Sequence, residues 1–292
     1  MKKYFVHTFS FIGILVLKAL SILPMAVLYV IADGFYLLLY KTFGYRKKVV
    51  KDNLKQSFPE KSESELLAIE KKFYHYLSDL IVETVKGFSI GKKEVTKRMQ
   101  FINRQVLDEL VVNNQSAIMV MGHYGNWEWL CRASQMLADN QMIVAYKPLS
   151  NSLFNDLMQK ARTKFGVMSV PMMQLPRVLK EQKKPYLLIL LADQSPSDRN
   201  GNIWVPFLNR ETAVMPGIEK LALKYKLPVY YNTIRLLKRG YYTCEFKLLC
   251  RENENTNEGD ITKLHTMALE KNIIEKPELW LWSHKRWKHK KQ

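Results

Sequence analysis

The chain has 292 residues, of which 47% are apolar, so it is long enough and apolar enough to build a packed core and is not expected to be disordered. With 45 lysines and arginines against 27 aspartates and glutamates, the formal net charge is +18. That charge predicts an acidic partner: a nucleic acid, an anionic membrane, a phosphorylated substrate or an acidic carrier protein. The three cysteines form no C-x-x-C pair, so the sequence indicates neither a disulfide framework nor a metal site.

The first 40 residues are apolar, and we predict that residues 1–40 are a membrane-anchoring helical segment. Between Tyr4 and Tyr40 the only formally charged side chains are Lys18 and Asp33. One membrane span, a hairpin and two helices in the membrane plane all fit this pattern, and the alternative without a membrane is a buried helical hairpin. Five basic residues follow between positions 41 and 51, which by the positive-inside rule places the rest of the chain on the cytoplasmic face.

Residues 41–90 have helical spacing of their apolar positions, and we expect them to form a helical platform. Ser62 is followed three residues later by Glu65, which is the pattern of a capping box at the start of a helix.

Residues 91–292 are predicted to be an α/β domain. Apolar runs at 117–121, 142–146 and 186–192 are typical of buried strands, and 227–237 with 241–250 is typical of a hairpin. Helices are expected at 153–165, 175–182, 215–225 and 260–274, and one begins near Trp127. We read 193–211 as a polar loop and the C-terminus as a basic tail. This order predicts a mixed, mostly parallel central sheet flanked by helices, with ligands beyond the carboxyl ends of its strands.

The stretch "GHYGNWEW" places His123 and Glu128 five positions apart, just after the strand at 117–121. On one continuous helix they would point about 140° apart, but Gly122, Gly125 and the N-cap candidate Asn126 predict a turn between strand and helix. An ionised carboxylate beside one imidazole nitrogen would orient the ring, so the other nitrogen could act as a general base. The alternative is a polar pair with no catalytic role.

Five blocks in the same order resemble the lipid A biosynthesis (lauroyl/myristoyl) acyltransferase family, within the lysophospholipid acyltransferase superfamily. They are the apolar, basic N-terminus, "GHYGNWEW", "AYKPLSNSLFNDLMQKAR", "LLADQSPSDRNGNIWVPFLNRETAVMPGIEKLA" and "LWLWSHKRWKHKK". The resemblance covers nearly the whole chain. In the wider superfamily the fourth of these blocks reads like E-G-T, where this chain has "ADQSPSDR".

The resemblance implies that His123 is the base that deprotonates an acceptor hydroxyl and that Glu128 is its orienting carboxylate. It also implies substrate-binding roles for Arg162 and Asp193, and we add Asn126 and Arg210 to that set. Arg162 is alternatively a surface helix charge, and Asp193 alternatively a turn former. If functional, Arg162 suits phosphate binding or an ion pair with Asp193.

The expected function is therefore transfer of a fatty acyl chain from an acyl carrier protein or coenzyme A thioester to a hydroxyl of a lipid A precursor, at the cytoplasmic face of the inner membrane. No metal, other cofactor or nucleic acid is expected. An alternative acceptor is a lysophospholipid or an aminolipid, and a membrane-tethered polyanion-binding protein is the alternative without catalysis. The tail "WSHKRWKHKK" in isolation also suits nucleic acid or solvent, but beside a membrane segment it suits anionic headgroups.

Overall fold

The computed structural model describes residues 2–136, 140–198, 200–252 and 256–291. Its centre is a seven-stranded sheet in the order β1-β9-β8-β2-β5-β3-β4, in which β8 and β9 are antiparallel and the other neighbours are parallel. Its strands are β1 (Met99–Phe101), β2 (Ala117–Met121), β3 (Gln141–Tyr146), β4 (Met168–Pro171), β5 (Tyr186–Leu191), β8 (Val229–Lys238) and β9 (Tyr241–Cys250). Strands β6 (Ile203–Phe207) and β7 (Arg210–Val214) form a separate two-stranded sheet. The expected mixed, mostly parallel sheet is confirmed.

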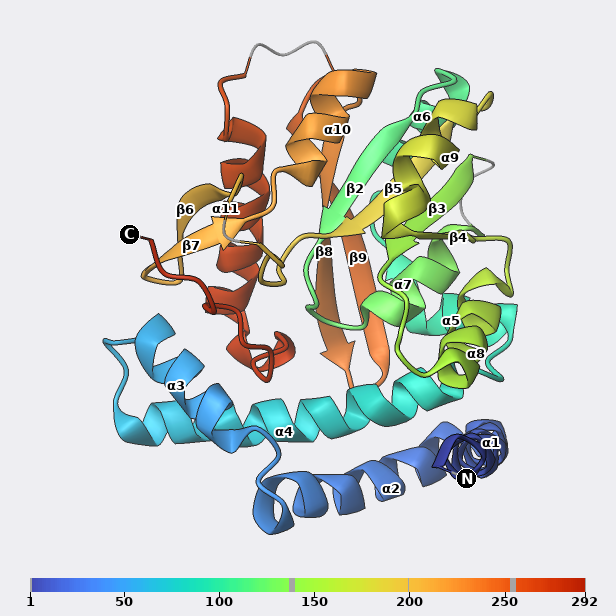
Figure 1. Cartoon of the computed structure of the whole chain (residues 1–292), viewed down its shortest axis with the longest axis vertical. Helices are drawn as coiled ribbons and strands as arrows, with labels where there is room; N and C mark the ends of the chain where they lie inside the picture. Colours follow the sequence, from blue (N-terminus) through green and yellow to red (C-terminus); the bar gives the residue numbers. More distant parts are fainter. Residues whose placement is uncertain (1, 137–139, 199, 253–255, 292) are drawn as a thin grey trace.

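Helices flank this sheet and extend beneath it (Figure 1). They are α1 (Lys2–Ile22), α2 (Met25–Tyr36), α3 (Lys47–Ser57), α4 (Glu63–Lys86), α5 (Lys92–Arg98), α6 (Gln105–Val112), α7 (Trp127–Ser134), α8 (Ser152–Thr163), α9 (Leu175–Glu181), α10 (Gly217–Tyr225) and α11 (Asp260–Glu275). A π-helical segment, η1 (Leu37–Thr42), continues α2, and two short 3₁₀ turns are η2 (Met172–Gln174) and η3 (Pro277–Leu279). Strands β2 and β5 are buried along nearly all their length, as their apolar runs predicted.

The long helix α4 runs across the base of the sheet, and α2 lies below it (Figure 1). The predicted capping box is present at the start of α4. The Glu65 backbone N–H donates to Ser62 Oγ at 3.3 Å, and the Ser62 backbone N–H donates to Glu65 Oε2 at 2.8 Å. Helix α2 buries Met25, Leu28 and Ala32. The platform therefore connects the N-terminal helices to the sheet.

The N-terminal apolar segment is two helices, because Pro24 lacks an amide hydrogen and disfavours helical geometry at the residue before it. The Lys86 ammonium group of α4 donates to the carbonyl groups of Ser21 and Leu23 at this break, at 3.1 and 2.9 Å. Within the described residues, Met25–Thr42 is long and apolar enough to cross a membrane, and 28% of it is buried within the protein.

The prediction of a polar loop at 193–211 is wrong for the second half of this stretch, which forms part of the β6–β7 hairpin. Two features concealed the hairpin. Pro206 within β6 is unusual in a strand, and the turn residues Leu208 and Asn209 both have positive φ, of 51° and 60°, where glycine is the usual signal. Strand β4 was also missed in the sequence, since it has only four residues.

Candidate active site

The side chain of His123 lies against Asp193 at the carboxyl ends of two adjacent parallel strands. His123 Nδ1 is 2.6 Å from Asp193 Oδ1, and the His123 backbone N–H donates to Asp193 Oδ2 at 2.9 Å. Met121 of β2 pairs with Leu191 of β5. His123 and Asp193 each come two residues after one of these paired positions. The sheet register therefore brings together residues that are 70 positions apart in the chain.

The turn between β2 and α7 forms as predicted. Gly125 has φ +62°, and a Cβ there would lie 2.5 Å from Ile234 Cγ2, so only glycine fits. A Cβ on Gly122 would lie 2.8 Å from a Leu269 methyl group and 3.3 Å from the Asp193 carboxyl carbon. Asn126 Oδ1 accepts from the Trp129 backbone N–H at 2.9 Å, which caps α7. The loop that carries His123 is thus held at both ends.

Asp193 is ionised and sets the tautomer of the histidine. Burial by itself would raise the pKa of Asp193, but the charge and hydrogen bonds of His123 and a hydrogen bond from Trp280 lower it to about 2. A carboxylate only accepts, so Nδ1 of His123 carries a hydrogen, and in the neutral form of the ring the lone pair lies on Nε2. His123 is 18% exposed, and its Nε2 lies 3.3 Å from Gln194 Nε2. This nitrogen is the one available to take a proton.

The predicted role of Glu128 as the carboxylate that orients His123 is wrong: in this structure Asp193 has that position. Glu128 is the second residue of α7, is buried, and faces α8, where Arg162 donates to both of its carboxylate oxygens. The expected ion pair between Arg162 and Asp193 is also wrong, because Arg162 binds Glu128 instead. Helix α7 starts only after the turn, and this turns Glu128 toward α8 rather than toward the imidazole.

Two arginines flank Glu128. The Arg132 guanidinium lies 3.7 Å from Glu128 Oε2 and is fully buried, whereas 19% of the Arg162 side chain is exposed. Burial would raise the pKa of Glu128, but the charge and hydrogen bonds of Arg162 and the charge of Arg132 lower it below its ordinary value. Arg162 is therefore fixed by a carboxylate while part of its side chain remains exposed.

Asn126, expected to bind substrate, is used by the protein itself. It is 0% exposed, and besides capping α7 its Nδ2 donates to Glu83 Oε2 at 2.6 Å. Glu83 also accepts from the hydroxyl groups of Tyr29 in α2 and Tyr242 in β9, both at 2.8 Å. Burial raises the pKa of Glu83 to about 7 against the effect of these hydrogen bonds. Asn126 thus connects the histidine loop to the platform.

Arg210, also expected to bind substrate, stacks on the ring of Trp287 with 4.1 Å from its Cζ to the ring centroid. Trp287 belongs to the C-terminal segment, defined here as residues 279–289. The basic tail expected there is a packed part of the protein, because Trp280 and Trp282 are 2% and 0% exposed. Aromatic burial outweighs the charge of the neighbouring lysines in this stretch.

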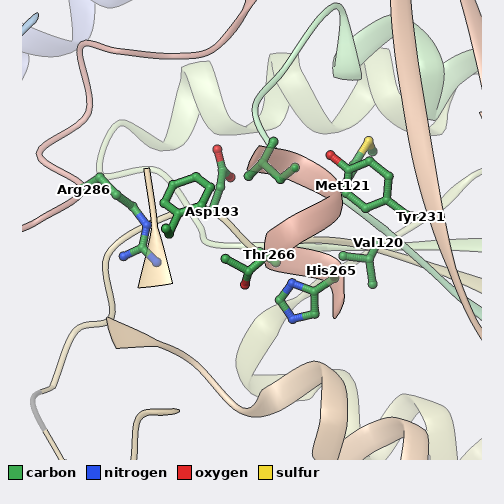
Figure 2. Close-up of a pocket in the computed structure, with 10 residues that line it drawn as sticks. Val120, Met121, Asp193, Tyr231, His265, Thr266 and Arg286 are labelled. Atoms are coloured by element: carbon green, nitrogen blue, oxygen red, sulfur yellow. The ribbon is translucent and has the colours of Figure 1, made fainter. Parts of the chain in front are cut away.

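A small cavity lies beside Asp193, lined also by Tyr231, His265, Thr266 and Arg286 (Figure 2). Its volume of about 10 Å³ admits about one water molecule, so it is not the space for an acyl chain. Burial and the charge of Arg286 lower the pKa of His265 to about 4, so this histidine is neutral at physiological pH.

Sequence reasoning missed Gln194, Arg132 and Trp280 as parts of the site. Gln194 follows Asp193 directly, and Arg132 lies one helical turn after Glu128, so the spacing could have indicated both. Trp280 is 157 positions from His123, and no local pattern joins the two.

The chain is similar to acyltransferases of lipid A biosynthesis. It is 23% identical to the lipid A biosynthesis lauroyltransferase of Escherichia coli (strain K12), over 96% of this chain and 91% of that protein. It is 22% identical to the lipid A biosynthesis palmitoleoyltransferase of Escherichia coli (strain K12) and to the lipid A biosynthesis acyltransferase of Shigella flexneri, in each case over 83% of this chain and 79% of the relative. The model of the bacterial lipid A biosynthesis acyltransferase family matches residues 2–289, and the chain therefore belongs to this family of acyltransferases.

Proposed function

We propose that this protein transfers a fatty acyl chain from an acyl carrier protein or coenzyme A thioester to a hydroxyl group of a phosphorylated lipid A precursor. The family supports acyl transfer in lipid A biosynthesis. The observation that carries the proposal is the 2.6 Å contact between His123 Nδ1 and Asp193, which leaves Nε2 as a base at the edge of the sheet.

In the proposed mechanism, His123 Nε2 takes the proton of the acceptor hydroxyl as the oxygen attacks the thioester carbonyl carbon. The C–O bond forms, and the carbonyl oxygen carries the negative charge of the tetrahedral intermediate. When the C–S bond breaks, the thiolate leaves and receives the proton from His123 Nε2. Asp193 holds the ring and stabilises the imidazolium between the two proton transfers.

Arg162 is proposed to bind a negatively charged group of the substrate, such as a phosphate of the acceptor. Its contacts with Glu128, five residues after His123, hold the planar guanidinium, and 19% of its side chain is exposed. A guanidinium held in this way suits phosphate or an oxyanion. In this proposal Glu128 acts by positioning Arg162 and not by touching the reacting atoms.

The N-terminal helices are proposed to lie in the plane of the cytoplasmic face of the inner membrane. One side of α2 is buried against α4, and its Asp33 is bound by Arg239 at 2.6 Å, a contact that membrane crossing would break. The exposed large apolar residues of the N-terminal helices and the turn that follows are Phe11, Ile12, Leu15, Val16, Ile22, Val27, Val30, Leu37, Leu38 and Phe43. Such a one-sided pair of helices is typical of interfacial binding, and nearby lysines add about 1 kcal/mol each toward anionic lipid.

The carrier protein is the proposed donor because the net charge of +18 favours an acidic protein partner. An electrostatically guided encounter of this kind weakens as salt rises. The rate with acyl carrier protein should therefore fall with salt more steeply than the rate with coenzyme A thioester.

The test is to offer purified protein in mixed micelles a set of acyl carrier protein and coenzyme A thioesters with a phosphorylated glucosamine lipid, a lysophospholipid and an aminolipid. Mass spectrometry of the products identifies the donor and the acceptor. The variant His123→Ala should lower transfer about 10²- to 10⁴-fold, as expected for loss of a general base. His75→Ala is the control, since His75 is exposed and stacks on Tyr36 away from the site.

Near-normal transfer by a folded His123→Ala protein would refute the mechanism. Acylation of the lysophospholipid or the aminolipid in place of the glycolipid would refute the proposed acceptor and leave the chemistry intact.

A further inference from the structure

The C-terminal segment reaches back to the loop that carries His123. The Leu281 backbone N–H donates to the His123 carbonyl group at 3.2 Å, and the Gly125 backbone N–H donates to the Leu279 carbonyl group at 3.1 Å. Between these bonds Tyr124 and Trp280 form an isolated antiparallel β-bridge. The end of the chain is therefore a backbone partner of the proposed catalytic loop.

This pairing places the indole of Trp280 on Asp193. Trp280 Nε1 donates to Asp193 Oδ2 at 2.8 Å, the same oxygen that accepts from the His123 backbone N–H at 2.9 Å. The other oxygen, Oδ1, faces His123 Nδ1 at 2.6 Å. With two donors on Oδ2, the carboxylate group cannot rotate without losing both bonds, so Oδ1 stays directed at the ring.

We propose that Trp280 is a positioning residue of the acyltransferase reaction, which acts by holding the Asp193 carboxylate in the orientation that aligns His123. This inference rests on the proposed function, because it assigns a role relative to the His123 base. Trp280 touches neither substrate nor base, and its contribution is the direction and charge of the Asp193 oxygens.

The indole is itself rigidly held. Its ring lies edge-on to Phe207 and Trp282, with centroid distances of 5.7 and 4.7 Å. Asn53 of α3 donates to the carbonyl groups of Trp282 and His284 at 2.9 and 3.0 Å. Helix α3 therefore anchors the C-terminal segment, and the segment in turn positions the carboxylate.

The chain contains a matched control. Trp282 is as buried as Trp280 and belongs to the same aromatic cluster, but its Nε1 donates to the Pro277 carbonyl group at 2.6 Å and not to Asp193. Replacing either tryptophan with phenylalanine removes a similar volume and one hydrogen bond. The two variants differ in whether the lost bond ends on Asp193.

The readout is the acidic limb of the pH–rate profile, which reports protonation of the His123 and Asp193 pair. Loss of the Trp280 bond leaves more negative charge on Asp193, which favours the protonated histidine and moves the limb to higher pH. The other titratable or charged side chains that interact electrostatically with the pair stay the same in both variants: Glu128, Tyr231, His284 and Arg286.

The experiment measures kcat, KM and the pH–rate profile of full-length Trp280→Phe and Trp282→Phe with the donor and acceptor that the mass-spectrometric test selects. Trp280→Phe should lower kcat about tenfold, as expected for one hydrogen bond to a charged group, with KM changed less than about twofold. Its acidic limb should move to higher pH. Trp282→Phe should lose about as much stability as Trp280→Phe, but its pH–rate profile should keep the acidic limb of the wild type.

If the two variants show the same pH–rate profile, the proposal is wrong and Trp280 has only a packing role. If Trp280→Phe does not fold, benzothienylalanine at position 280 keeps the shape of the ring and replaces the N–H with sulfur. A wild-type profile for that protein would also overturn the proposal. Failure of the proposed function is a separate result, since His123→Ala would then remain active whatever Trp280 does.

Discussion

Asp193→Asn tests which carboxylate orients the histidine. Asp193 Oδ2 accepts from the His123 backbone N–H and from Trp280, so the asparagine carbonyl oxygen must take that position. Its NH₂ group then faces Nδ1 of His123, which can only accept, and the ring hydrogen is forced onto Nε2. The base nitrogen would carry a hydrogen before the acceptor arrives. A wrong tautomer of this kind lowers kcat by roughly 10⁴-fold in a comparable histidine–carboxylate pair.

Glu128→Gln is the matched comparison, because it removes the charge that holds Arg162 without touching the imidazole. We expect it mainly to raise KM for the phosphorylated acceptor and to reduce stability, since Arg132 and Arg162 then lie near each other without a carboxylate. Initial rates by mass spectrometry, from pH 5 to 9, separate the two variants. Nitrogen chemical shifts of labelled histidine report the tautomer directly.

Asp193→Asn should also change how the stability of the protein depends on pH. The pKa of Asp193 is lowered from 3.8 to about 2, so its ionised form contributes about 2 kcal/mol of stability above pH 4. That contribution is lost as the pH falls from about 4 toward 2, and Asp193→Asn should lack this part of the acid transition. The reasoning is refuted if Asp193→Asn keeps near-normal kcat while Glu128→Gln abolishes it.

Two further predictions concern Glu83 and Asn126. The pKa of Glu83 is raised from 4.5 to about 7, so the wild-type protein loses stability as the pH rises between these values. In urea unfolding, the stability of Glu83→Gln relative to wild type should therefore increase by roughly 3 kcal/mol between pH 4 and 8. A stability difference that does not change with pH would contradict this. Asn126→Ala should cost about 1–2 kcal/mol and lower kcat, because it releases the loop that carries His123. The control Ser62→Ala removes a remote cap and should reduce stability with kcat unchanged.

Local features of the fold were predictable because they depend on neighbouring residues. Ser62 caps a helix because Glu65 lies three residues later. Gly125 and Asn126 predict the turn between β2 and α7, since one relieves the backbone at positive φ and the other satisfies an amide at the helix start. The buried strands β2 and β5 are readable as continuous apolar runs. The hairpin β6–β7 was not, because its turn has no glycine and β6 contains Pro206.

What the sequence determined by itself was the fold class, the histidine at a strand end and the family of acyltransferases. Only the tertiary structure decided which carboxylate faces that histidine. Glu128 is five positions away and turns toward Arg162, whereas Asp193 is 70 positions away and meets the ring because β2 and β5 are adjacent in register. Trp280 arrives from the far end of the chain through a β-bridge. Spacing along the chain sets the direction of a side chain within one element, but contacts between elements depend on strand order and packing, which local pattern does not contain.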